Sequence, residues 1–217
     1  PTDELSDVLK TCRSQKVSLT SFLAALMCKT LEESVESKGY AGSLIKIDIP
    51  MNTRKVCMLN LNCEPKGCKI GNFVAPLELQ YNMNDCRNIW EVAKYFQERL
   101  YVQSVDNISD TINNVKLLDV VDNAEFIKEK LRVAGLPGTF EITNLGLQKF
   151  DQTPGLSSEF KVEDAFFNEP QGISNIFTCA IISTPVGGLN CSISYPRNIK
   201  AEFQPFIERV RNKVSEK

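Results

Sequence analysis

Histidine is missing from this 217-residue chain. Imidazole is the side chain that most readily gains and loses a proton near neutral pH, so histidine-based hydrolase triads and histidine-ligated metals are excluded within these residues. A general base here would have to be a carboxylate or a lysine. The acidic residues lie at predicted helix starts and on polar helix faces, and their spacing assigns no pair of them to one cleft.

Three further absences narrow the class of protein. The net charge of −2 provides no cationic surface, so we expect neither nucleic acid nor an anionic membrane surface as a partner. No apolar run approaches the roughly 20 residues of a transmembrane helix, and no segment resembles a signal peptide. We therefore expect a soluble, cytoplasmic protein. Because the chain opens with Pro1 and not with methionine, we also expect a fragment whose start and targeting signals lie upstream.

Cysteine, by contrast, is abundant, with eight residues at positions 12, 28, 57, 63, 68, 86, 179 and 191. An even cysteine count indicates a disulfide framework in a short secreted chain, but this chain is neither short nor visibly secreted, so we expect reduced thiols. Cys57, Cys63 and Cys68 fall close together in a predicted loop, which raises zinc as an alternative. No C-x-x-C pair and no histidine completes a tetrahedral site, so we expect no metal.

Five stretches of the chain have the spacing of amphipathic helices. Ser18 is a predicted N-cap, with Val17 and Phe22 placed as a hydrophobic staple. Asn88 and Asp122 are each followed three residues later by glutamate, as in a capping box. The predicted helices span residues 5–12 after a Thr2 cap, 19–31 before a stop at Gly39, 89–100, 123–131 before Gly135 and Pro137, and 203–214.

Six stretches rich in β-branched or aromatic residues are predicted strands: 44–49 closed by Pro50, 73–81 with Pro76 at an edge or bulge, 139–144, 161–167, 176–183 and 189–195. Residues 176–182 are nearly all apolar, as in a central strand covered on both faces. Residues 185–188 predict a hairpin turn, whereas residues 51–70 lack a sustained period and predict a long loop or a bent strand extension. The pattern predicts a soluble α+β domain.

Four short segments, in order along the chain, resemble the C-terminal half of the chloramphenicol-acetyltransferase-like superfamily: VSLT at 17–20, IPMNTR at 49–54, IGNFV at 70–74 and FEITNLG at 140–146. Within that superfamily, IST at 182–184 and GGLN at 187–190 bring the chain nearest to fungal alcohol O-acetyltransferases. Peptide-synthetase condensation domains share the first three segments more loosely. The resemblance covers nearly the whole chain.

The resemblance implies that residues 1–217 form one C-terminal lobe of a CoA-dependent acyltransferase, with a mixed β-sheet sandwiched by helices. In that superfamily, an acyl group such as acetyl passes from its CoA thioester to an alcohol, or to an amine, in a tunnel between two lobes. The catalytic base is the first histidine of a His-x-x-x-Asp motif in the N-terminal lobe. This chain lacks the motif. The resemblance therefore implies no catalytic residue here, no activity alone, and an N-terminal lobe as partner, in the same or a separate chain.

The resemblance also implies which residues wall the tunnel. Thr143, Asn144 and Gly146 stand at the end of a predicted strand, where side chains or amides could face the reacting carbonyl. In the alternative interpretation, Asn144 caps a turn in which Gly146 has a positive φ. Asn72 and Ser183 are further tunnel candidates, against the alternatives of a turn residue and a solvent-facing strand serine.

Arg54 matches an arginine that the resemblance places near the lobe interface. We expect it to pair with a carboxylate of the other lobe, because a guanidinium presents a rigid fork for such contacts, and we expect no catalytic role. An isolated lobe would expose the apolar surface that normally faces its partner, so we expect this chain to dimerise or to copurify with another segment.

Two other functions stay open at the level of sequence. The chain could be a binding or interaction module descended from such a lobe, and an upstream His-x-x-x-Asp motif would argue against that. It could also be a thiol-dependent enzyme using one of its cysteines. That hypothesis predicts a reactive thiol with a low pKa.

Overall fold

The computed structural model describes residues 2–35, 39, 42–60, 70–85, 87–116, 119–134, 138–150, 162–170, 172 and 174–215. Its α-helices are α1 (Thr2–Gln15), α2 (Leu19–Val35), α3 (Arg54–Asn60), α4 (Ile89–Tyr101), α5 (Ile108–Lys116), α6 (Asn123–Ala134) and α7 (Lys200–Ser215). Its strands are β1 (Leu44–Asn52), β2 (Val74–Asn82), β3 (Phe140–Leu147), β4 (Phe177–Thr184) and β5 (Gly188–Ser194). A π-helical turn, η2 (Val102–Asp106), links α4 to α5, and a 3-10 turn, η5 (Arg197–Ile199), precedes α7.

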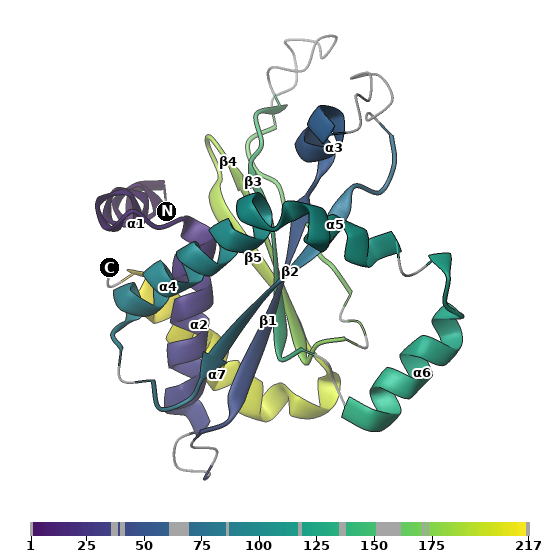
Figure 1. The fold of residues 1–217 in the computed structure, drawn as a ribbon. Helices are drawn as coiled ribbons and strands as arrows, with labels where there is room; N and C mark the ends of the chain where they lie inside the picture. The colour runs from purple at the N-terminus through teal and green to yellow at the C-terminus, as the bar shows by residue number, and fades with distance from the viewer. Residues whose placement is uncertain are drawn as a thin grey trace.

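The strands form one mixed sheet in the order β2-β1-β3-β4-β5 (Figure 1). β1, β3 and β4 are parallel to one another, whereas β2 and β5 run antiparallel to their neighbours at the two sides of the sheet. The predicted α+β class with a mixed sheet is confirmed. β1, β3 and β4 therefore end where β2 and β5 begin, near α3 at the top of Figure 1. We call this side of the sheet the carboxyl edge.

One face of the sheet is covered by α1, α2, α4 and α7, whose apolar side chains form a single buried cluster with the strands. On β1, Ile45, Ile47 and Ile49 face this cluster, and Lys46 and Asp48 between them face the other way. Burying an isoleucine contributes about 1.5–3 kcal/mol relative to exposure, so the alternation fixes which face each strand residue takes. None of the helices in the described part of the chain is long and apolar enough to cross a membrane.

The predicted N-caps Ser18, Asn88 and Asp122 are confirmed, and at α4 the full capping box with Glu91 is present. Asn88 Oδ1 accepts hydrogen bonds from the Trp90 and Glu91 backbone N–H groups, and Glu91 Oε2 accepts from the Asn88 N–H. Ser18 Oγ and Asp122 Oδ1 likewise accept from N–H groups in the first turn of their helices. These bonds satisfy donors that have no partner within the helix, which fixes where each helix begins. α1 is an exception, since it already includes its predicted cap residue.

Two predictions after β1 are wrong. Pro50 does not close the strand, which continues to Asn52. It lies opposite Pro76 of β2, and because neither proline has an N–H, this must be one of the non-hydrogen-bonded pairs that alternate in an antiparallel ladder. Residues 51–70, predicted as a long loop or a bent strand extension, extend β1 to Asn52 and then contain α3, which has only seven residues and is too short for its period to be read from sequence. Residues 61–69 lie outside the described residues.

The predicted strand at 161–167 is also wrong. Residues 162–170 form no strand and lie over the face of the β4–β5 hairpin that is turned away from the helices. Thr184 Oγ1 donates to the Glu163 carbonyl at 2.9 Å, and Ser194 Oγ donates to the Glu169 carbonyl at 2.7 Å. Side chains of the hairpin thus hold this segment without a backbone ladder. The predicted strands at β2, β3, β4 and β5 are confirmed to within three residues at each end.

The free side of β2 is occupied by a side chain of η2. The Glu78 N–H donates to Gln103 Oε1 at 2.9 Å, and Gln103 Nε2 donates to the Glu78 carbonyl at 2.8 Å. One side-chain amide therefore satisfies both main-chain groups of an edge residue. Pro76, two positions earlier on this edge strand, has no N–H to offer.

Candidate functional site

The carboxyl edge brings predicted site residues from four strands to one side of the sheet. Asn144 and Gly146 lie at the end of β3, and Ser183 lies beside them at the end of β4. Arg54 follows β1, and Asn72 comes just before β2, whose first residue pairs with the last residue of β1. Neighbouring strands are about 4.8 Å apart, so the start of β2 lies roughly 10 Å from β3, two strands away. Residues scattered along the sequence thus share one surface.

The pleat of the sheet separates Thr143 from the other two candidates at the end of β3 and β4. Successive strand residues point to opposite faces, and Ile142 belongs to the helix-covered cluster, so Asn144 faces the helices as well. Ile181 of β4 belongs to the same cluster, which places Ser183 on that face too. Thr143 faces the other way and is half-buried. The structure therefore brings Asn144 and Ser183 together on one face and leaves Thr143 on the opposite one.

Asn144 is held at both ends of its side-chain amide. Its Nδ2 donates to Thr20 Oγ1 in the first turn of α2 at 3.1 Å, and its Oδ1 accepts from the Gly146 N–H at 2.8 Å. Gly146 has a φ of +68°, and the pairing of β3 with β4 shifts register between Asn144 and Leu147. The geometry of the alternative interpretation, a capped turn with a left-handed glycine, is therefore present. It fixes the Asn144 amide in one orientation at the carboxyl edge.

Arg54 connects the end of β1 to the entry of β2. Its backbone N–H donates to Asn52 Oδ1 at 3.1 Å, and its Nη2 donates to the Gly71 carbonyl at 3.0 Å. The guanidinium carbon lies 5.0 Å from the centre of the Phe73 ring, within the range of a cation–π contact. Arg54 thus has partners inside this chain, which positions the segment that carries Asn72.

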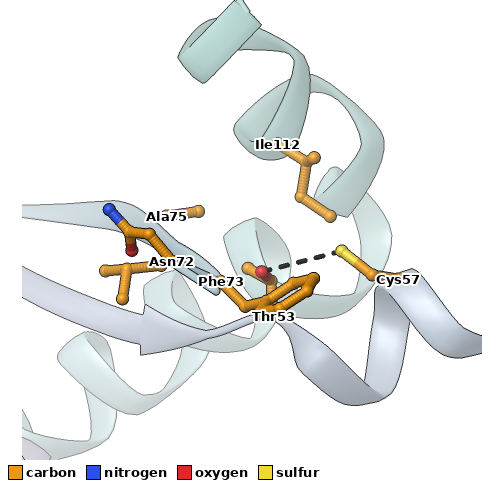
Figure 2. A pocket seen from close by; sticks show the side chains of 7 residues that line it. Thr53, Cys57, Asn72, Phe73, Ala75 and Ile112 are labelled. Carbon is orange, nitrogen blue, oxygen red and sulfur yellow. Dashed lines mark hydrogen bonds between the residues drawn. The ribbon is translucent and has the colours of Figure 1, made fainter. Parts of the chain in front are cut away.

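A hollow of about 150 Å³ opens between α3, α5 and the start of β2 (Figure 2). Thr53 lies at its base and is only 4% exposed; the Cys57 thiol donates to Thr53 Oγ1 at 3.7 Å. Ile112 of α5 lies across from this pair in Figure 2. The hollow is lined by Thr53, Cys57, Asn72, Phe73, Val74, Ala75 and Ile112.

Sequence reasoning identified only one of these lining residues, Asn72. Ile112 belongs to α5, for which no helix was predicted, and Cys57 belongs to α3, which was predicted as loop. The only signal in the sequence was the Gly71-Asn72-Phe73 step into a predicted strand. A hollow made by elements far apart in sequence leaves no local pattern.

A carboxyl group with an unusual pKa lies on the face turned away from the helices. Burial of Glu141 on β3, together with the negative charges of Glu169 and Asp48 and a hydrogen bond with Glu169, raises its pKa to about 7. Asp48 is its register partner on β1. One oxygen of Glu141 is fully buried without a hydrogen-bond partner, so the neutral form is favoured at this position.

Two thiols on the β4–β5 hairpin are in contact. Cys179 Sγ and Cys191 Sγ lie 3.1 Å apart. The hydrogen bond between them raises the pKa of Cys179 and lowers that of Cys191. Burial raises the pKa of Cys179 further. The burial of Cys12 and Cys28 raises their pKa values. Within the described ranges, no three histidine, cysteine or acidic side chains are grouped so that they could hold a metal ion.

Large apolar side chains are exposed along the same edge as the candidate residues. Ile70, four positions before the start of β2, is 92% exposed, and Leu147, the last residue of β3, is 54% exposed. Single exposed apolar residues are common on protein surfaces, but several on one side mark a contact surface. The group consists of Ile70, Val74, Leu145, Leu147 and Val186.

Comparison with known proteins finds one matching family model and one curated relative. The sequence model of one family, described as alcohol acetyltransferase, matches residues 1–211. The chain is 41% identical over 211 residues to N-acetyltransferase SLI1 of Saccharomyces cerevisiae. That alignment covers 96% of this chain and 45% of the relative, so the chain spans less than half of the relative's length.

Solved structures share the fold at low sequence identity. Polyketide synthase associated protein 5 from Mycobacterium tuberculosis matches with a TM-score of 0.59 and 13% identity, over 99% of this chain and 48% of its own. The epimerization domain from the third module of tyrocidine synthetase B matches with a TM-score of 0.58 and 12% identity, over 100% of this chain and 46% of its own. Vinorine synthase matches with a TM-score of 0.56 and 12% identity, over 93% and 43%.

Proposed function

Because this chain belongs to the alcohol acetyltransferase family, we propose that residues 1–217 form the C-terminal lobe of a two-lobed acetyltransferase and wall one side of its substrate tunnel. The reaction is transfer of an acetyl group from acetyl-CoA to an alcohol. The catalytic histidine comes from an N-terminal lobe outside these residues, and this lobe is inactive alone. The lack of histidine, in a chain that spans 45% of its relative's length, supports this division.

The observation that carries the proposal is the composition of the carboxyl edge. Polar candidates from β3 and β4 and the turn before β2 lie on the same side of the sheet as a row of exposed apolar side chains. A surface with both features suits a contact that is apolar where the lobes meet and polar where substrate passes. We assign the tunnel wall to Asn144, Gly146, Asn72 and Ser183, joined at the same strand end by Thr143 from the opposite face of β3.

The chemistry defines what this lobe has to supply. The acceptor hydroxyl loses its proton as its oxygen attacks the thioester carbonyl, and the oxyanion that forms needs hydrogen-bond donors where the charge develops. Asn144 Nδ2 is a donor held in place by Thr20 and by the turn at Gly146, so its position needs no reorganisation. Arg54 stands at the rim of the same edge, and we assign it a carboxylate of the other lobe as a further partner.

An amine is the second candidate acceptor. The observation that favours it is the 41% identity with a relative named as an N-acetyltransferase. Both acceptors attack the same thioester carbonyl and both must lose a proton, so the two reactions make the same demand on the donors of this lobe. The difference between them lies in the contacts to the acceptor.

The test joins the two halves. The chain is assayed alone and together with the part of the Saccharomyces cerevisiae relative that it does not cover, with acetyl-CoA and either 1-butanol or butylamine, which differ only in the attacking atom. Release of the free CoA thiol is expected only from the joined halves, and it is expected to stop when the histidine of the partner's His-x-x-x-Asp motif is replaced by alanine.

Four outcomes decide between the proposed functions. Faster CoA release with 1-butanol supports an alcohol acceptor, and faster release with butylamine supports an amine. Binding of the two halves without CoA release from either acceptor supports the non-catalytic interaction module instead. Turnover by this chain alone contradicts the division of labour between the lobes.

A further inference from the structure

The hollow between α3, α5 and β2 has the size and lining of a site for a short hydrocarbon group. We propose that it binds an unbranched alkyl chain of up to about six carbons, carried either by the acyl group or by the acceptor alcohol. This inference rests on the proposed function for the identity of the substrate, but the binding itself does not depend on turnover. The following contacts carry it.

The hollow has few polar atoms that need a hydrogen bond from an occupant. The side chains of Phe73, Ala75 and Ile112 supply apolar walls. The one buried hydroxyl, Thr53 Oγ1, already accepts a hydrogen bond from the Cys57 thiol, so an apolar occupant leaves it paired. Asn72 is mostly exposed, and Figure 2 shows its amide directed away from Cys57. An alkyl group therefore fits this lining better than a charged or strongly hydrogen-bonding one.

The volume limits the length of the chain. A protein cavity of roughly 150 Å³ lined by apolar side chains is known to bind benzene, a six-carbon molecule. The hollow has about the same volume, 150 Å³. Each methylene group moved from water into such a site strengthens binding about fourfold, up to the point where the site is full. Affinity is therefore expected to rise with chain length to about six carbons and then to stop rising.

The position of the hollow connects it to the proposed tunnel. Thr53 follows directly after β1, and Phe73 comes just before β2, so the hollow opens at the carboxyl edge. The Phe73 ring also contacts Arg54, and the Thr53 N–H donates to the Phe73 carbonyl at 2.8 Å. Thr53 and Phe73, which both line the hollow, are thus held together by a backbone hydrogen bond. A hydrocarbon tail in it would extend from the same side of the sheet as Asn144.

The first test reads binding on the chain itself. Cys57 lines the hollow, so an occupant should shield it from iodoacetamide; labelling of each cysteine is followed by peptide mass spectrometry. We expect 1-hexanol to slow labelling of Cys57 at least threefold, and 1-propanol to do so only at a concentration higher by more than tenfold. Cys191 lies on the exposed side of β5 and outside the hollow, so its labelling rate is expected to stay unchanged.

Variants that fill the hollow give the matched control. Ile112→Phe and Ala75→Leu are expected to abolish the protection by 1-hexanol, whereas Ile112→Val is expected to keep it. Ile112 belongs to α5 and Ala75 to β2, so if one variant disturbs the fold, which circular dichroism would reveal, the other still tests the hollow. The proposal is overturned if 1-hexanol leaves Cys57 labelling unchanged, if it slows Cys57 and Cys191 equally, or if a folded filling variant retains full protection.

The second test identifies the source of the chain. The joined halves are assayed with acyl-CoAs from acetyl to octanoyl at fixed ethanol, and with alcohols from ethanol to 1-octanol at fixed acetyl-CoA. The series whose preferred length shortens in Ile112→Phe and lengthens in Ile112→Ala occupies the hollow; no shift in either series overturns the proposal. If the joined halves show no turnover, the proposed function fails, and the labelling experiment still decides whether the hollow binds alkyl groups.

Discussion

The Asn144 side chain ties the end of β3 to the start of α2, because its Nδ2 donates to Thr20 Oγ1 at 3.1 Å across 124 residues of sequence. The same amide accepts the Gly146 N–H through Oδ1. We expect Asn144→Ala to lower the free energy of unfolding by about 1–2 kcal/mol, since it leaves two polar groups without their partner. Urea unfolding of the chain measures this.

A double-mutant cycle isolates the contact with Thr20. Asn144→Ala and Thr20→Val, alone and combined, should show a coupling of about 0.5–1.5 kcal/mol. Leu145→Ala, next to Asn144 but half-exposed, is the control and should change stability little. Strict additivity of the two single variants would mean that the contact does not stabilise the fold.

Two glycines at strand ends should differ in how they tolerate alanine. A Cβ at Gly146 meets no atom within 4 Å, so Gly146→Ala should lose only the cost of a positive φ, about 1 kcal/mol. A Cβ at Gly138 would lie 1.9 Å from Asn175 Oδ1 and 2.8 Å from Asp48 Oδ2, so Gly138→Ala should cost about 3 kcal/mol. Gly172→Ala, with open space and no positive φ, is the neutral control. Thermal unfolding ranks the three, and a larger loss at Gly146 than at Gly138 would contradict the described packing.

Stability should fall as the pH rises from about 4.5 to about 7. The folded-state pKa of Glu141 is raised to about 7 from 4.5 by its burial and by the charges of Glu169 and Asp48, so in this window the folded chain holds a proton that the unfolded chain has released. The stability that this bound proton contributes is complete below pH 4.5 and is lost as the pH rises past 7. Glu32 and Asp85, whose pKa values are lowered, act in the opposite direction and only below about pH 4.5.

Glu141→Gln removes this titration while keeping the shape of the side chain. We expect urea midpoints of the variant to be flat between pH 5 and pH 7.5, where those of the unchanged chain decline. Glu163→Gln, on the exposed part of the 162–170 segment, is the control and should decline like the unchanged chain. Equal slopes for the chain with and without Glu141 would show that another group titrates in this range.

Cys191 should be alkylated faster than Cys12, Cys28 and Cys179. The hydrogen bond from Cys179 lowers the pKa of Cys191, whereas the pKa values of the other three are raised. Cys179→Ala should slow labelling of Cys191 at pH 7 and shift its pH profile to higher pH. Rates followed between pH 6 and pH 9 provide the measurement. Uniformly slow labelling of all four thiols would contradict the described pair, and uniformly slow labelling of all eight cysteines would dismiss a thiol-dependent enzyme.

Arg54→Ala should lower the free energy of unfolding of the chain by about 1 kcal/mol. It removes the hydrogen bond to the Gly71 carbonyl and the contact with the Phe73 ring. Arg54→Lys keeps the charge but lacks the planar fork, so it should recover only part of the loss. Lys55→Ala, at the exposed neighbouring position, is the control. If urea midpoints of Arg54→Ala and Lys55→Ala coincide, the contacts within this chain contribute nothing, and only the other lobe can explain Arg54.

The parts of the fold that were predicted from sequence are those fixed by neighbours along the chain. The Asn88–Glu91 capping box needs only four consecutive residues, and β4 was recognisable because a strand covered on both faces is apolar throughout. The strand predicted at 161–167 was wrong because side chains of the β4–β5 hairpin, such as Ser194, hold residues 162–170 in place. Such long-range contacts leave no periodic pattern in the sequence. The helix α3 was not predicted because its two turns are too short to show a helical period.

The candidate site divides in the same way. Asn144 and Ser183 lie at the same edge of the sheet because β3 and β4 are parallel. The sequence predicts that a strand ends at each of these residues. The separation of Thr143 onto the other face depends on which residue of β3 enters the core, and Ile142 settles that only in the folded sheet. The hollow depends on Ile112, whose helix had no signal in the sequence, so its existence could not be derived beforehand.

The two hydrogen bonds between the Gln103 side-chain amide and the Glu78 backbone limit how a strand of another molecule can pair with β2. Outward-facing main-chain groups on a boundary strand are templates onto which foreign chains add, the first event in many aggregates. Here one such position offers no donor because it is Pro76, and at the next the donor and acceptor of Glu78 are already taken by an internal amide. Addition of a foreign strand is therefore disfavoured at these two positions of β2.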